Sequence, residues 1–230
     1  MSSGDHPRTF EMARDVIRSA HNNGSAEDLM LFYDRWAPNY EQDVDLIEYR
    51  APRLVAAQVA AHFGGERQAA MVLDVACGTG MHAGVAQMKR EGFQRFVGVD
   101  GSERMLQHAR QSGLYQDLQM AVLGEQPIPV PSGAFDVVTI SGGLSSSHVP
   151  AKAIRELLRA AKRGGLVCMS TRANRDNVAY KVALEGEMKK MEDEGLWRRV
   201  EVTRVSRFER GVSDHEGGHV PGCVYLFQKL

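Results

Sequence analysis

The sequence predicts a doubly wound α/β fold built on a mostly parallel seven-stranded sheet. From residue 71 onward, short apolar runs alternate with helical patterns, which is typical of parallel strands joined by crossover helices. These runs are continuous rather than alternating, as expected of strands covered on both faces. The first run, M-V-L-D-V-A at Met71–Ala76, leads directly into a glycine-containing loop, as in Rossmann-like nucleotide-binding folds.

The N-terminal residues predict helices that precede this sheet. Residues 1–9 are polar and predict a flexible tail. Apolar residues at helical spacing predict three helices, over Phe10–Ala20, Leu29–Trp36 and Val44–Phe63. Pro52 predicts a break or kink in the third helix. We therefore expect a single domain over residues 10–230, with a helical extension at 10–65 and a core at 70–230.

The core alternates strands and helices. Strands are predicted at Met71–Ala76, Phe96–Val99, Leu118–Leu123, Phe135–Ile140 and Leu166–Thr171. Helices are predicted at 81–91, from an N-cap at Ser102 to about Arg110, at 151–162 and at 175–196. Two longer strand candidates, 198–209 and 220–229, flank the loop G-V-S-D-H-E-G-G-H and predict an antiparallel hairpin at the sheet edge.

Composition and charge exclude several classes of function. The formal net charge of −1 provides no basic footprint for nucleic acid. Cys77, Cys168 and Cys223 are widely separated, which excludes zinc-type spacing and fits a reducing compartment. The sequence has no run of 18 apolar residues and no apolar signal core at its start. We therefore expect a monomer that binds neither nucleic acid nor membranes and is cytoplasmic, with the nucleus as the alternative.

The segment V-L-D-V-A-C-G-T-G carries the clearest functional signal. Gly78 and Gly80 permit unusual backbone angles and close approach of a ligand at the carboxyl end of a strand. Asp100 ends the next strand, 20 residues after Gly80, where a carboxylate can accept hydrogen bonds from both hydroxyls of a ribose. This spacing predicts a nucleoside site. A dinucleotide would also fit, but the third glycine of its motif is missing, and no Walker lysine follows for ATP.

The same loop resembles the first motif of the class I S-adenosylmethionine-dependent methyltransferases, D-x-G-x-G-x-G. Asp74, Gly78 and Gly80 match that motif, and Ala76 replaces its first glycine. V-G-V-D-G-S-E-R-M-L resembles the second motif, and P-S-G-A-F-D-V-V and A-I-R-E-L-L-R-A-A-K-R-G-G-L resemble segments near the fourth and fifth strands. The resemblance covers residues 30–172. It implies S-adenosylmethionine as cofactor, S-adenosylhomocysteine as product, and no metal.

The resemblance also implies a set of cofactor-binding residues. The set comprises Tyr33, Trp36, Tyr40, Asp74, Ala76, Cys77, Gly78, Thr79, Gly80, Asp100, Gly101, Ser102, Met105, Leu123, Gly124 and Ser141. Within it, Asp100 would bind the ribose and Met105 would lie near the adenine. Gly124 replaces an aspartate that binds the adenine amine in many members, so Leu123 and Gly124 would act through backbone atoms, with Glu125 as a substitute. Ser141 would lie near the transferable methyl group.

Three aromatic residues of the N-terminal extension support two interpretations. Tyr33, Trp36 and Tyr40 share one helical face. They either pack the N-terminal helices on the sheet or form a lid, as a Y-D-x-x-A-x-x-Y segment does in similar methyltransferases. A lid would exclude water and present aromatic faces to a sulfonium cation.

Polar side chains after the fourth and fifth strands are candidates for the acceptor side. His148, in S-S-S-H-V-P, is the histidine best placed as a general base, with a solvated loop or helix-cap histidine as the alternative. Arg172, Asn174 and Tyr180 are candidate substrate-side residues. His215 and His219 share a loop with Asp214 and Glu216, but the glycines between them favour a solvated loop over a metal site.

These patterns together predict a methyltransferase that acts on an unidentified small-molecule or protein acceptor. The segment Ile140–Gly143 lacks the Asn/Asp-Pro-Pro-aromatic motif of enzymes that methylate amino groups of nucleic-acid bases. The alternative is a cofactor-binding protein that has lost transfer activity and acts through partners. A nicotinamide oxidoreductase is a third hypothesis, disfavoured by the missing third glycine.

Overall fold

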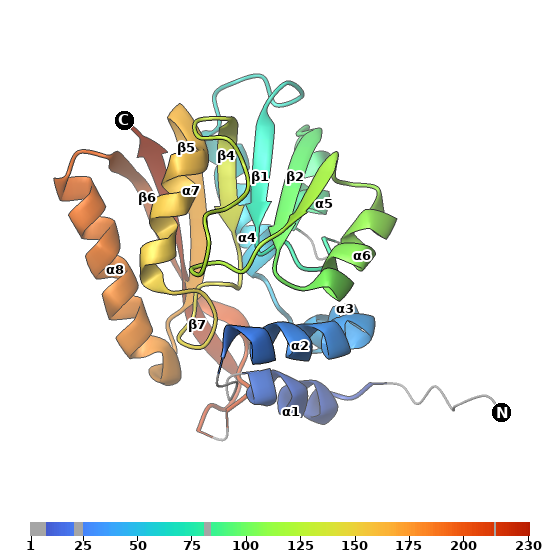
Figure 1. Cartoon of the computed structure of the whole chain (residues 1–230). Helices are drawn as coiled ribbons and strands as arrows, with labels where there is room; N and C mark the ends of the chain where they lie inside the picture. The colour runs from blue at the N-terminus through green and yellow to red at the C-terminus, as the bar shows by residue number, and fades with distance from the viewer. Residues whose placement is uncertain (1–7, 21–24, 81–83, 214) are drawn as a thin grey trace.

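The computed structural model describes residues 8–20, 25–80, 84–213 and 215–230, which form a seven-stranded sheet with helices around it (Figure 1). The strand order is β3-β2-β1-β4-β5-β7-β6. Strands β1 to β5 run parallel, and β7 runs antiparallel between β5 and β6. The predicted doubly wound fold with an antiparallel C-terminal hairpin is confirmed.

The elements follow one another as the sequence predicts. The strands are β1 (Met71–Val75), β2 (Arg95–Asp100), β3 (Asp117–Met120), β4 (Phe135–Ile140), β5 (Ala161–Arg172), β6 (Trp197–Arg210) and β7 (His219–Lys229). The helices are α1 (Phe10–Ala20), α2 (Ala26–Trp36), α3 (Tyr40–Leu46), α4 (Ala51–His62), α5 (Gly84–Arg90), α6 (Glu103–Ser112), α7 (Ile154–Ala160) and α8 (Val178–Asp193). Short 3₁₀ turns lie at Ala37–Asn39, Ala151–Ala153 and Arg175–Asn177. Residues 81–83 of the predicted helix 81–91 lie outside the described residues.

The sheet is buried on both faces because its strands carry apolar residues at successive positions. Leu73 and Val75 of β1 belong to a core cluster completed by residues of α7 and α8. Val72, which directly precedes Leu73, points to the opposite face and packs in a second cluster with residues of α4 and α5. Continuous apolar strands are therefore explained by two helical layers.

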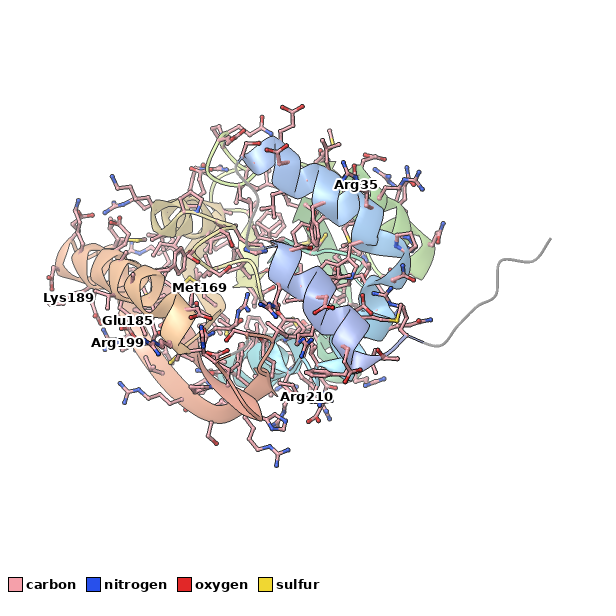
Figure 2. All side chains as sticks on the ribbon, turned by 90° about the horizontal axis from the view of Figure 1, so that it is seen from below. Arg35, Met169, Glu185, Lys189, Arg199 and Arg210 are labelled. Carbon is pink, nitrogen blue, oxygen red and sulfur yellow. The ribbon has the colours of Figure 1, made fainter. Side chains whose placement is uncertain are left out.

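The N-terminal helices α1, α2 and α3 lie across one end of the sheet (Figures 1 and 2). They form a small core of their own, which includes Ile17, Trp36 and Val44. The guanidinium of Arg210, at the end of β6, lies 3.7 Å from the centre of the Phe10 ring and ties α1 to the sheet. Arg8, at the end of the predicted tail, donates a 2.8 Å hydrogen bond to the buried carboxylate of Asp43, and residues 1–7 lie outside the described residues.

The prediction of one helix over Val44–Phe63 was wrong, because two helices occupy that segment. The carbonyl of Ile47 accepts from the amide of Arg210 at 2.7 Å, and the amide of Arg50 donates to the carbonyl of Phe208 at 3.2 Å. The carbonyl of Ile47 and the amide of Arg50 thus bond to β6 instead of forming the hydrogen bonds of a continuous helix. Pro52 lies in the first turn of α4, where its missing N–H costs nothing.

Several other boundaries differ from the predictions, for example the start of α2 at Ala26 instead of Leu29 and the end of α8 at Asp193 instead of residue 196. The third strand ends at Met120 rather than Leu123, which forms only an isolated bridge. The helix predicted over 151–162 ends at Ala160, and β5 begins at Ala161. Gly165 lies within β5, where a Cβ atom would approach the carbonyl oxygens of Phe135 and Asp136 to 3.1 Å. Gly165 therefore permits close contact between β5 and β4, which is more than ending the helix. Among the described residues, no helix has both the length and the apolar character to cross a membrane.

Candidate functional site

The loop after β1 has a left-handed backbone at alternate residues. Ala76 has a φ of 55°, Gly78 of 56° and Gly80 of 68°. This conformation explains the family's glycine at the position of Ala76, because it costs a residue with a side chain about 1–2 kcal/mol. A Cβ atom on Gly78 would meet no atom within 4 Å, whereas one on Gly80 would lie 2.4 Å from the ring of Tyr115. Gly78 therefore borders open space, and Gly80 is required by packing.

The carboxylate of Asp100 holds this loop to the end of β2. Its Oδ2 accepts from the amide of Gly78 at 2.8 Å, and its Oδ1 accepts from the amide of Ser102 at 2.9 Å. Burial raises the pKa of Asp100, and the hydrogen bonds from these two amides oppose that rise. Each carboxylate oxygen has a further lone pair, so Asp100 can also accept from two ligand hydroxyls.

Asp74 does not face the pocket but packs on the other side of the glycine loop, against Tyr115 and Thr139. Its two oxygens accept from the Tyr115 hydroxyl at 2.8 Å and the Thr139 hydroxyl at 3.1 Å. Burial raises the pKa of Asp74 to about 6, although both hydrogen bonds lower it. Asp74 thereby holds the Tyr115 ring beneath Gly80.

A single pocket extends from the glycine loop to the end of β5, beneath the N-terminal helices. Ten residues of the predicted cofactor set line it: Tyr33, Trp36, Tyr40, Ala76, Gly78, Asp100, Gly101, Met105, Leu123 and Ser141. Six others do not line it: Asp74, Cys77, Thr79, Gly80, Ser102 and Gly124. Cys77, Thr79 and Gly80 belong to the glycine loop itself, whereas Asp74 and Ser102 lie beside it. Gly124 lies apart, with a φ of 91° and the ring of Pro150 against its α-carbon.

The N-terminal helices are hydrogen-bonded to the two loops that form the floor of the pocket. Asp34 of α2 accepts from the Ser102 hydroxyl at 2.6 Å and from the Arg104 amide at 3.1 Å. The Ser102 hydroxyl also accepts from the Met105 amide, so it caps α6 as predicted. Glu41 of α3 accepts from the Thr79 hydroxyl. These bonds place α2 and α3 directly over the glycine loop and the start of α6.

The aromatic residues of the extension pack on one another and also face the pocket. The Trp36 ring centre lies 5.7 Å from that of Tyr33 and 4.8 Å from that of Tyr40. All three residues line the pocket. The packing and lid interpretations are therefore compatible, because the same side chains form the roof.

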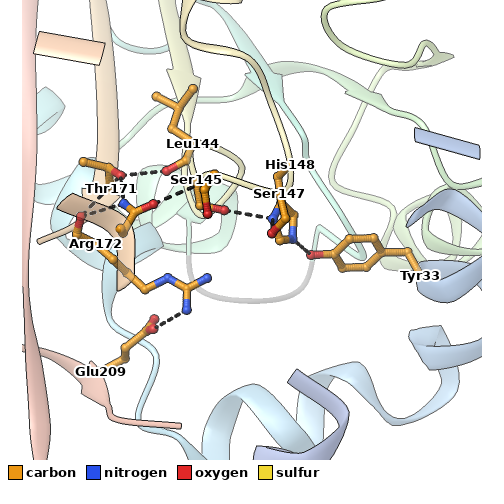
Figure 3. A network of polar contacts seen from close by, with 10 residues as sticks. Tyr33, Leu144, Ser145, Ser147, His148, Thr171, Arg172 and Glu209 are labelled. Atoms are coloured by element: carbon orange, nitrogen blue, oxygen red, sulfur yellow. Dashed lines mark hydrogen bonds and ion pairs between the residues drawn. The ribbon is translucent and has the colours of Figure 1, made fainter. Parts of the chain in front are cut away.

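His148 lies on the loop after β4 and faces Tyr33 of the roof (Figure 3). Its Nε2 is 2.7 Å from the Tyr33 hydroxyl, and its Nδ1 is 2.8 Å from the Ser145 hydroxyl. The Ser147 hydroxyl lies 3.3 Å from Nδ1. The ring is half-buried and lines the pocket, so the structure does not support the solvated-loop alternative.

At its far end, the pocket contains several residues that the sequence did not suggest. Tyr49, Ser170, Phe208 and Glu209 line it together with Arg172, the only one of these that the sequence had suggested. The Arg172 guanidinium lies 3.5 Å from the Glu209 carboxylate (Figure 3). No local motif marks these residues, because they come from separate elements that meet only in the folded sheet.

Other candidates from the sequence lie away from the pocket. Asn174 and Tyr180 do not line it, and the Tyr180 hydroxyl donates to the carbonyl of Val149 at 2.6 Å. The Nε2 of His219 lies 2.9 Å from a carboxylate oxygen of Glu48. Asp214 lies outside the described residues. Within the described ranges, no cluster of three or more His, Cys, Asp or Glu residues could hold a metal ion.

Comparison with known proteins agrees with this geometry. A family model described as a methyltransferase domain matches residues 73–169. A human protein is 45% identical over 194 residues, which cover 84% of this chain and 78% of the human protein. The chain therefore belongs to the class I S-adenosylmethionine-dependent methyltransferases.

That human relative is methyltransferase-like protein 27. The segments Y-D-R-W-A-P-N-Y-E-Q-D, Y-R-A-P-R-L and G-L-V-C-M-S-T-R predict a narrower resemblance to this human protein, and the identity of 45% over 194 residues confirms the relationship. The ubiquinone/menaquinone biosynthesis C-methyltransferase UbiE of Pseudoalteromonas translucida is 32% identical over 56% of this chain and 53% of its own length. The crystal structure of an S-adenosylmethionine-dependent methyltransferase from Mesorhizobium loti shares the fold, with a TM-score of 0.54 and 15% identity, over 76% of this chain and 98% of that one.

Proposed function

We propose that the protein transfers a methyl group from S-adenosylmethionine to a small-molecule acceptor held beneath the N-terminal helices. The observation that carries this proposal is the continuity of the pocket, which joins Asp100 at the end of β2 to Arg172 at the end of β5. One part suits a nucleoside and the other has room and polar groups for a second molecule. Because α2 and α3 cover the pocket, a small acceptor fits it better than a side chain on the surface of a folded protein.

The residues of the first part fit the cofactor. Gly78 leaves open space where a side chain would stand, and Asp100 keeps lone pairs for the ribose hydroxyls. Met105 and Leu123 supply apolar surface for the adenine. We assign Asp74, Cys77, Thr79, Gly80, Ser102 and Gly124 indirect roles, because they shape the loops without lining the pocket.

The protein's contribution to the reaction is orientation and exclusion of water. When bound, the cofactor supplies a methyl group that its sulfonium has already activated. Tyr33, Trp36 and Tyr40 close the pocket from above and favour a cation through their ring faces. Holding the two reactants in line removes much of the entropic barrier to the displacement.

His148 is our candidate general base. The Tyr33 hydroxyl bonded to its Nε2 would be displaced by an acceptor hydroxyl or would relay the proton from it. Ser145 at Nδ1 fixes the orientation of the ring. An acceptor that reacts without losing a proton would not need this residue.

Two experiments test the proposal. Calorimetry should show binding of S-adenosylhomocysteine and no binding of NADH. Cofactor with a tritiated methyl group, incubated with a cell extract divided into small-molecule and protein fractions, should label the small-molecule fraction. Label in the protein fraction alone would contradict the small-molecule acceptor, and cofactor binding without any label would favour a binding protein. Failure to bind S-adenosylhomocysteine would reject the proposal as a whole.

A further inference from the structure

A pair of opposite charges forms part of the pocket wall opposite the glycine loop. The Nη1 atom of Arg172 lies 3.5 Å from Oε1 of Glu209, and the two side chains are 16% and 5% exposed. Both residues line the pocket. In Figure 3 they lie to the lower left of His148 and Tyr33. The pair is therefore removed from bulk water but accessible to a bound ligand.

The partners of Glu209 satisfy its carboxylate incompletely. The 3.5 Å separation exceeds the 2.7–2.9 Å typical of a charge-assisted hydrogen bond. Among the described residues, no hydrogen bond to this carboxylate is found, although it has about four acceptor positions. Burial raises the pKa of Glu209, and the charge of Arg172 opposes that rise. Since an apolar pair of similar volume is often at least as stable as a buried ion pair, stability alone does not explain these residues.

The fold brings this pair together across an intervening strand. Arg172 is in register with Gly222 of β7, and Glu209 is in register with Val220. A Cβ atom on Gly222 would lie 2.3 Å from the Phe208 ring, so the glycine gives space for Phe208 to lie over β7. The strands β5 and β6 are hydrogen-bonded to β7 and not to each other, so the charge pair is not part of the strand pairing.

Ser170 provides a second, independent observation. It precedes Arg172 by two residues on β5, so both side chains project to the same face. Ser170 is fully buried and lines the pocket, and its Oγ has no hydrogen-bond partner within the described part of the chain. A buried hydroxyl without a partner is unfavourable, and a ligand oxygen at this point would satisfy it.

We infer that the acceptor is a small zwitterion of the amino-acid type, whose carboxylate binds Arg172 and Ser170 and whose ammonium group binds Glu209. This inference rests on the proposed methyl transfer. A zwitterion places two opposite charges a few ångströms apart, which complements a protein pair separated by 3.5 Å. It gives each protein charge a new partner and leaves the pocket's net charge unchanged. An acceptor that carried only a carboxylate would compete with Glu209 for Arg172 and add a second negative charge beside a buried carboxylate.

The test compares three sets of probes on the wild-type protein with saturating S-adenosylhomocysteine. The first set contains α-, β- and γ-amino acids, the second their N-acetyl derivatives, which lack the ammonium group, and the third their amides, which lack the carboxylate. Calorimetry should find at least one amino acid that binds more than tenfold more tightly than both of its derivatives. With labelled S-adenosylmethionine, the same amino acid should be methylated.

Variants then assign the contacts. Glu209→Gln, which keeps the side-chain shape, should weaken binding of the amino acid at least tenfold and leave S-adenosylhomocysteine affinity within about twofold. Ser170→Ala should weaken the amino acid several-fold. Glu192→Gln is the matched control, because it removes the charge of a half-buried glutamate outside the pocket that pairs with Arg199 at 3.0 Å, and it should change the affinity for neither ligand.

Three outcomes would overturn the inference while leaving methyl transfer intact. They are binding of S-adenosylhomocysteine with no binding by any amino acid, equal binding of an amino acid and its derivatives, and unchanged amino-acid affinity in folded Glu209→Gln. Loss of S-adenosylhomocysteine binding by the wild-type protein would instead reject the proposed function.

Discussion

Replacement of Gly78 by alanine tests two roles of this glycine. The change in the free energy of unfolding reports its backbone conformation, and the change in cofactor affinity reports its contact with the ligand. Its φ of 56° makes alanine unfavourable by about 1–2 kcal/mol, partly offset by about 0.4–1 kcal/mol because alanine restricts the unfolded chain. The added methyl meets no protein atom within 4 Å, so it adds no internal clash. We expect a net loss of about 1 kcal/mol in the free energy of unfolding.

The same methyl would occupy the space that we assign to the cofactor. Overpacking of a well-filled site typically costs about 1–3 kcal/mol, so S-adenosylhomocysteine should bind roughly 5- to 150-fold more weakly to Gly78→Ala. Calorimetric titration measures this loss, and urea unfolding measures the change in stability.

Gly113→Ala is the matched control. Gly113 follows α6 with a φ of 63°, and its Cβ position also meets no atom within 4 Å. The residue does not line the pocket. Both variants should therefore lose similar stability, and only Gly78→Ala should lose cofactor affinity. Equal affinities for the two variants would refute the placement of the cofactor against Gly78.

Three further predictions follow from the contacts around the pocket. Asp34→Ala removes two hydrogen bonds that hold α2 on the start of α6, so it should weaken S-adenosylhomocysteine binding by about 1–2 kcal/mol and increase amide exchange over residues 25–45. Glu27→Ala, an exposed change on the same helix, should do neither, and equal exchange in the two variants would argue against the lid. The pKa of Asp74 is raised from 3.8 to about 6, so this residue favours the folded state at low pH by about 3 kcal/mol, and that contribution is lost as the pH rises through 6. In denaturant titrations, Asp74→Asn should therefore raise the free energy of unfolding at pH 8 relative to that at pH 4 by about 2–3 kcal/mol compared with the wild type, and an unchanged pH dependence would contradict this role. Asp100→Ala should weaken S-adenosylhomocysteine by about 1–3 kcal/mol in calorimetry, and unchanged affinity in a folded variant would remove Asp100 from the ribose site.

The features that the sequence predicted correctly are those that depend on local residues. A left-handed turn after a buried strand requires glycines close together in the chain, and the N-cap of α6 requires Ser102 directly before it. Alternation of apolar strands with helices was enough to predict the sheet and its C-terminal hairpin, because each strand carries its own burial pattern.

Features that depend on distant segments could not be predicted in the same way. The helix predicted over Val44–Phe63 is interrupted because residues 47–50 bond to the end of β6, and nothing within the segment indicates those partners. Glu209 reaches Arg172 only through the strand order β5-β7-β6 and an irregularity of the β6–β7 register between Val205 and Glu209. The cofactor half of the pocket was therefore accessible to sequence reasoning, whereas the acceptor half required the structure.

A crystal structure of the protein with S-adenosylhomocysteine tests most directly whether Asp100 and the loop at Gly78 form the nucleoside site. We predict that both ribose hydroxyls lie within hydrogen-bonding distance of the Asp100 carboxylate and that the ligand backbone passes in front of Gly78. A complex in which the ligand occupies another place, with this crevice empty, would contradict the assignment.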